Sequence, residues 1–149
     1  FNVARKLVEC GVKPAQVSSH LYDNYTAGRL QLLQQVLATM KIYGDGRVAI
    51  IQVNTDMLES TGCSLVDTEN FINLPRSITS VKVAIFLKEI GSDIVSVSLR
   101  AKDSCDVADV AAQFGGGGHR NAAGFRASLT TLDEVRDRLL SVMLKEFDC

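Results

Sequence analysis

The clearest hydrophobic pattern lies in the second half of the chain, where a period of two gives way to a period of three to four. Over residues 94–100, apolar positions alternate with two serines and Arg100, which predicts a half-buried strand ending at Arg100. Over residues 107–114, apolar side chains recur at spacings of three and four, which predicts a short helix. Asp106 is suited to cap the start of this helix and Gly115 to follow its end. The pattern therefore predicts a strand, a short helix and then a glycine-rich loop.

The same two spacings of apolar residues predict secondary structure in the rest of the chain. Helices are expected at residues 2–9, 14–25, 26–40, 55–61 and 131–145, and strands at residues 48–53, 81–87 and 94–99. In the third helix, the stripe expected to pack in a core consists of Leu30, Leu33, Leu37 and Met40. The last helix begins with a capping box formed by Thr131 and Glu134. The alternation of strands and helices predicts an α/β fold, in which helices flank a mixed β-sheet.

Composition and charge argue against two classes of protein, those that capture duplex nucleic acid over long range and those that span a membrane. The chain has 149 residues, of which 46% are hydrophobic, so it can bury one sizeable core. A net charge of −1 argues against long-range capture of duplex nucleic acid, although a local site can still hold a few phosphates. No apolar run reaches membrane-spanning length, and four scattered cysteines are typical of reduced thiols. We therefore expect a cytoplasmic protein without a membrane partner.

A metal site is not expected within this chain. It contains two histidines and four cysteines, and these residues never cluster with aspartates at the spacing of metal ligands.

A run of four glycines, Gly115–Gly118, followed by His119 is the strongest candidate for functional chemistry. Without a Cβ, these residues can adopt positive φ and expose several backbone N–H groups to a ligand. Taken alone, such a run fits a flexible hairpin connection as well as a ligand loop. Because the predicted strand ends at Arg100, its guanidinium and the imidazole of His119 are expected to converge on one cleft. A planar guanidinium can hold a phosphate through two hydrogen bonds.

Three segments together resemble a known domain family. They are residues 98–102 (Ser-Leu-Arg-Ala-Lys), 106–107 (Asp-Val) and 114–125, which contains the glycine run, His119 and an Ala-Ala-Gly sequence. This combination resembles the DHHA1 domain of the DHH phosphoesterase superfamily, and within it the bifunctional oligoribonuclease and pAp phosphatase group, the nanoRNases. Segments 46–49, 76–78 and 81–89 also follow the order of that group, so the resemblance covers nearly the whole chain.

The resemblance implies a division of the chain and of the chemistry. Residues 1–25 would be the helical tail of a preceding DHH catalytic domain, residues 26–40 a linker helix, and residues 41–149 the DHHA1 substrate-binding domain. In the superfamily, an Asp-His-His triplet and further aspartates of the DHH domain hold two divalent ions, usually manganese, and this chain lacks the triplet. The parent protein would thus be a phosphoesterase that hydrolyses short oligoribonucleotides or 3′-phosphoadenosine 5′-phosphate (pAp). The present chain alone would be inactive.

The same resemblance implies roles for individual residues. His119 would reach the substrate phosphate near the metals and assist catalysis, and Arg100 would contact a phosphate. The other implied substrate-binding residues are Lys102, Arg120, Gly115, Gly116, Gly117 and Gly118.

Other functions remain open at this stage. DHHA1-type domains also occur at the end of alanyl-tRNA synthetases, so a non-catalytic RNA-binding module is an alternative, although a long coiled coil is missing. Cyclic-dinucleotide phosphodiesterases and exopolyphosphatase-like proteins are alternatives within the enzyme class. The expected partners are a short RNA or nucleotide phosphate and the DHH domain of the same polypeptide, with a homodimer left open.

Overall fold

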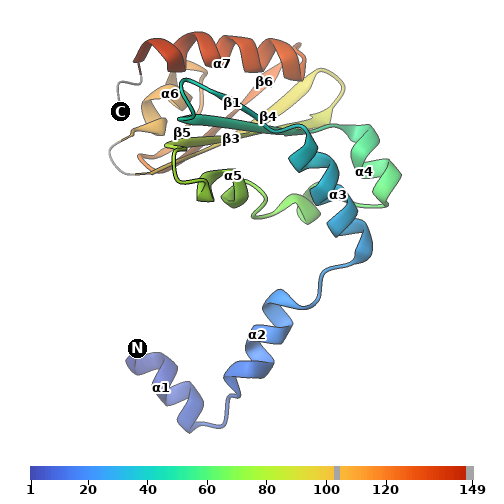
Figure 1. Ribbon diagram of the computed structural model, residues 1–149, viewed down its shortest axis with the longest axis vertical. Helices are drawn as coiled ribbons and strands as arrows, with labels where there is room; N and C mark the ends of the chain where they lie inside the picture. The colour runs from blue at the N-terminus through green and yellow to red at the C-terminus, as the bar shows by residue number, and fades with distance from the viewer. Residues whose placement is uncertain (103–104, 147–149) are drawn as a thin grey trace.

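The computed structural model of the protein describes residues 1–102 and 105–146 (Figure 1). The helical segments are α1 (Asn2–Glu9), α2 (Pro14–Tyr22), α3 (Ala27–Ala38), α4 (Thr55–Thr61), the 3-10 turn η1 (Leu65–Thr68), α5 (Asn73–Ser77), α6 (Val107–Gln113) and α7 (Leu132–Glu146). The strands are β1 (Lys41–Tyr43), β2 (Val48–Val53), β3 (Val83–Gly91), β4 (Ile94–Ala101), β5 (Gly117–His119) and β6 (Ala122–Ser128).

The strands form one six-stranded sheet with the order β1-β2-β3-β4-β6-β5. Strands β2 and β3 are parallel, and every other neighbouring pair is antiparallel. The parallel pair requires a crossover connection, which α4, η1 and α5 provide. The prediction of an α/β fold with a mixed sheet is therefore confirmed.

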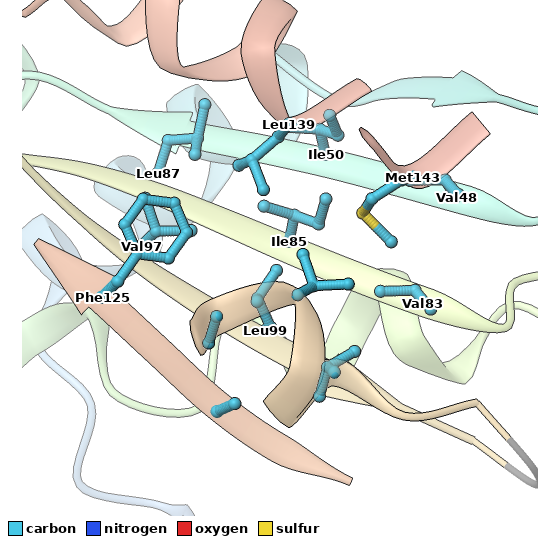
Figure 2. Close-up of a cluster of buried hydrophobic side chains, with 14 of the residues drawn as sticks. Val48, Ile50, Val83, Ile85, Leu87, Val97, Leu99, Phe125, Leu139 and Met143 are labelled. Atoms are coloured by element: carbon cyan, nitrogen blue, oxygen red, sulfur yellow. The ribbon is translucent and has the colours of Figure 1, made fainter. Parts of the chain in front are cut away.

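Helices cover both faces of the sheet, with α6 and α7 on one face and α3, α4 and α5 on the other (Figure 1). The larger core lies under α6 and α7, where Leu139 and Met143 pack against Ile85 and Leu99 (Figure 2). The second core lies under α3, where Leu32 and Val36 meet side chains of β2 and β3. Strand β3 is buried on both faces over residues 83–87, as is typical of a strand with a parallel neighbour and helices on both sides.

Most of the local predictions are confirmed. Strand β2 and helix α4 have the predicted bounds, and Gly62 ends α4 with a left-handed φ of 63°. Asp106 caps α6 by accepting a hydrogen bond of 2.9 Å from the Ala108 N–H. The capping box of α7 is present, because the Thr131 N–H donates to the Glu134 carboxylate and the Glu134 N–H to the Thr131 hydroxyl.

The predicted apolar stripe at Leu30, Leu33, Leu37 and Met40 is confirmed only in part. Leu33 and Met40 are half-buried and pack against the second core, whereas Leu30 is exposed and Leu37 is half-buried. The fully buried residues of α3 are Leu32 and Val36, which the stripe leaves out. Because α3 packs on the sheet, the segment expected to be a linker contributes side chains to the core of the sheet domain.

Helices α1 and α2 extend away from the sheet (Figure 1), and neither contains a buried residue. Apolar side chains such as Leu7 and Leu21 are therefore exposed. The assignment of residues 1–25 to a preceding domain stays a prediction. Among the described residues, no helix combines the length and the apolar character that a membrane crossing requires.

Candidate functional site

Helices α3, α4 and α5 leave part of their face of the sheet uncovered, over strands β4, β6 and β5. Strand β4 alternates strictly: Val95, Val97 and Leu99 are buried under α6 and α7, and the residues between them are half-buried on the opposite face. We call this surface the open face. It consists of Ser96, Ser98 and Arg100 of β4, Ala122, Gly124 and Arg126 of β6, and Gly117 and His119 of β5.

The register of the three strands places the predicted site residues in one row. Arg100 pairs with Ala122, and Ala122 pairs with His119. Directly paired residues project from the same face of a sheet, and two strand spacings separate backbones by about 10 Å. Arg100 and His119 thus stand on either side of Ala122, on the same face of the sheet. Their convergence on one cleft stays a prediction.

The sheet surface between these two side chains, which we call the floor of the open face, consists of the small residues Ala122, Gly124 and Gly117. In the adjacent row, Ser98 pairs with Gly124, which in turn pairs with Gly117. A Cβ at Gly117 would meet no atom within 4 Å, so the space above this position is open. The open face can therefore admit a flat ligand against its backbone.

Part of the glycine run has a structural role that the sequence analysis did not predict. Gly115 has a φ of 76°, and its N–H donates to the Ala112 carbonyl at 3.0 Å. The N–H of Gly116 donates to the Ala111 carbonyl at 2.8 Å. This is the Schellman arrangement that ends a helix, here α6. The expectation that all four glycines offer N–H groups to a ligand is wrong for these two, because their N–H groups are occupied.

Two of the glycines are required for close backbone contact. A Cβ on Gly116 would overlap the Gly124 carbonyl oxygen and the Cβ of Phe125, and one on Gly118 would lie 2.5 Å from the Ala122 carbonyl oxygen. The run thereby lets β5 lie tightly on β6 and carry His119, which is exposed, at the edge of the sheet.

A pocket adjoins the open face on the side of Arg100. It lies between the segment from η1 to α5 and strands β3 and β4. Arg100 lines this pocket, and its Nη1 donates a hydrogen bond of 2.9 Å to the carbonyl of Leu99. The pocket is lined by Thr68, Glu69, Asn70, Ile72, Asn73, Phe86, Lys88, Ser98 and Arg100.

Lys88 is a residue of this pocket that the sequence analysis missed. Its ammonium lies 4.7 Å from the centroid of the Phe86 ring, and the side chain is half-buried. Burial and the nearby charge of Arg100 lower the pKa of Lys88, while Glu69 acts in the opposite direction. The only signal in the sequence is its position two residues after Phe86, on the same face of a strand.

The structure does not bring all predicted contact residues to the open face. Lys102 donates a hydrogen bond of 2.7 Å from its ammonium to the carbonyl of Ile78, the residue that ends α5. Its side chain therefore has a structural partner beside α5. Arg120 lies in the turn between β5 and β6, where its carbonyl accepts a 2.9 Å hydrogen bond from the Val107 N–H. In residues 1–102 and 105–146, no three or more His, Cys, Asp or Glu side chains are grouped to hold a metal ion.

Comparisons with known proteins identify relatives of this chain. The model of the DHHA1 domain family matches residues 34–145 of the chain. A curated relative, the bifunctional oligoribonuclease and PAP phosphatase NrnA of Thermus thermophilus, is 29% identical over 146 residues, which cover 98% of this chain and 43% of the relative.

Solved structures share the fold. The crystal structure of an exopolyphosphatase-related protein from Bacteroides fragilis has a TM-score of 0.83 and 30% identity, covering 97% of this chain and 44% of that one. The pGpG-specific phosphodiesterase PggH from Vibrio cholerae has a TM-score of 0.53 and 12% identity, covering 91% and 43%, which is a likeness of fold alone. The chain thus spans less than half the length of these relatives.

Proposed function

Because the chain belongs to the DHHA1 domain family, we propose that it is the substrate-binding part of a DHH-superfamily phosphoesterase. Its substrates are short oligoribonucleotides, pAp, or both, in keeping with the two activities in the name of the relative from Thermus thermophilus. The observation that carries the proposal is the row Arg100, Ala122 and His119, which sets a guanidinium and an imidazole on either side of an open floor.

The proposal divides the reaction between two domains of one polypeptide. A DHH domain of the same polypeptide would hold two manganese ions, whose chemistry would be to activate water and to stabilise the leaving oxygen. The relatives support this division, because they are more than twice as long as the matched region. The protein is proposed to be cytoplasmic, in line with Cys10 and Cys63, neither of which forms a disulfide.

The residues of this chain bind and orient the substrate. The guanidinium of Arg100 offers paired N–H donors to a phosphate, a geometry that a lysine cannot reproduce. His119 stands on β5, the outermost strand, where its ring can reach across to a neighbouring domain. There it donates a hydrogen bond to the reacting phosphate as negative charge develops. Gly117, where a Cβ would meet nothing within 4 Å, leaves room for a nucleoside to lie between the two side chains.

We expect the 149-residue chain alone to show no turnover of oligoribonucleotides or pAp with added manganese, whereas the two-domain protein hydrolyses them. The reason is that the described residues offer no cluster for two metal ions. Release of mononucleotide or phosphate from both proteins measures the difference. Manganese-dependent turnover by the chain above a buffer control would contradict the division. A two-domain protein that binds RNA without hydrolysing it would instead favour a non-catalytic RNA-binding module.

A further inference from the structure

The side chain of Arg29 ties the connection between α2 and α3 to the sheet domain. Residues 23–26 form this connection, and Figure 1 shows α1 and α2 extending from it away from the sheet. We propose that Arg29 is a positioning residue, which holds the connection and one wall of the pocket beside Arg100 in a fixed arrangement. The inference rests on the proposed function, in which the connection leads to a preceding DHH domain and the pocket adjoins the substrate.

The start of α3 fixes the backbone of Arg29. Thr26 is the N-cap of this helix, and its hydroxyl accepts a hydrogen bond of 3.1 Å from the Arg29 N–H. Arg29 therefore stands in the first turn of α3, directly after the connection. A positive charge is unfavourable there, because the helix dipole is itself positive at this end. The charge of Arg29 thus does not serve the stability of α3.

The guanidinium of Arg29 contacts both the connection and the sheet domain. Its Cζ atom lies 4.1 Å from the centroid of the Tyr25 ring and 5.7 Å from that of the buried Phe71 ring, both within the range of cation–π contacts. Its Nη2 donates a hydrogen bond of 2.9 Å to the carbonyl of Glu69. Arg29 therefore joins Tyr25 to a segment that lies far along the chain.

That segment is the wall of the pocket beside Arg100. Glu69 and Asn70 line the pocket, and Asn70 has a left-handed φ of 69°. The Glu69 side chain acts inside the pocket, where its charge opposes the lowering of the Lys88 pKa by burial and by Arg100. Because Arg29 holds the carbonyl of the same residue, a displacement of Arg29 would change both the shape and the charge of the pocket.

The arrangement of Arg29 carries a cost. Its Nε is buried and has no hydrogen-bond partner within residues 1–102 and 105–146. A buried donor without an acceptor is unfavourable, and the helix dipole adds to this cost. A guanidinium turned toward solvent would avoid both. The contacts of Arg29 thus hold two segments together at the expense of local stability, as is typical of residues that align a functional site.

The test asks whether a change at Tyr25 reaches the pocket wall through Arg29, by amide NMR of the isotope-labelled, metal-free chain. Tyr25→Leu removes the ring, so we expect the amide resonances of residues 69–73 to shift. Tyr25→Phe keeps the ring and should leave them in place. In the Arg29→Met background, Tyr25→Leu should shift none of them further, because the link is already lost. Arg29→Lys lacks the planar guanidinium and should serve as an equivalent second background.

Kinetics of the two-domain protein provide the second measurement. Arg29→Met and Tyr25→Leu should each lower kcat/KM for pAp about tenfold through misalignment, and the double variant should fall no further. Tyr25→Phe should retain the unaltered rate. The control is Arg5→Met, which removes an exposed guanidinium paired with Glu9 on α1 and should change neither the rate nor the amides of residues 69–73.

The outcomes separate this inference from the proposed function. Tyr25→Leu without a shift at residues 69–73, a shift that persists in the Arg29→Met background, or rate losses that multiply would overturn the role of Arg29 while the proposed function stands. If the amides respond as expected but the two-domain protein hydrolyses neither pAp nor oligoribonucleotides, the proposed function is wrong and the link through Arg29 stands.

Discussion

His119→Ala is expected to lower kcat of the two-domain protein by roughly 10²–10³, with a smaller change in KM, because it removes one preorganised donor to the transition state. Steady-state kinetics with pAp and manganese measure the change. The side chain is exposed on an edge strand, so the free energy of unfolding should be unaffected. An unaltered kcat would contradict a catalytic role for His119.

Arg100→Ala provides the matched comparison in the same row of the sheet. Because Arg100 holds phosphate in both the ground and the transition state, its loss should raise KM more than it lowers kcat. If Arg100→Ala mainly raises KM and His119→Ala mainly lowers kcat, Arg100 binds the substrate and His119 assists the reaction. Identical signatures would contradict that assignment.

Gly116→Ala is expected to destabilise the fold by about 2–3 kcal/mol, the cost of forcing a methyl group into a packed region. The added Cβ would overlap the Gly124 carbonyl oxygen and the side chain of Phe125, which are held by the sheet. Thermal unfolding followed by circular dichroism should show Tm falling by roughly 10 °C.

Gly117→Ala is the control for this prediction, one residue further along the same run. A Cβ there meets nothing within 4 Å, so the free energy of unfolding should change by less than about 0.5 kcal/mol. The same methyl group would stand on the open face and is expected to weaken nucleotide binding. Equal loss of stability in both variants would refute the view that only some of the glycines are needed for packing.

Elements with strong local signals could be predicted from the sequence. The strand at 48–53 consists of apolar, mostly β-branched residues except for Gln52. The caps at Asp106 and Thr131 act through hydrogen bonds with their own helices. These features depend on neighbours along the chain and not on the rest of the fold.

Elements that depend on distant partners could not be predicted. Strands β5 and β6 are rich in glycine and alanine, which have weak β propensity, and they form because β4 supplies a pairing edge. Helix α3 has leucines on several sides, so only the position of the sheet decides that Leu32 and Val36 are buried.

The residues of the candidate site likewise include some that could be predicted from the sequence and some that could not. Arg100 and His119 belong to short motifs and were predicted to converge, whereas Lys88, on another strand, was not singled out as a site residue. Its proximity to Arg100 follows only from the register of β3 against β4. Lys102, by contrast, lies in the motif, yet its ammonium donates to the carbonyl of Ile78.

The central claim is that the open face of the sheet binds nucleotide phosphates, and titration of the isotope-labelled chain with pAp, followed by amide NMR, tests it most directly. Because one domain offers only part of the contacts, we expect weak binding. The resonances that shift should be those of Ser98, Arg100, Gly117, His119 and Ala122, with α7 unaffected. Shifts confined to α6 and α7, or to the N-terminal helices, would contradict the account.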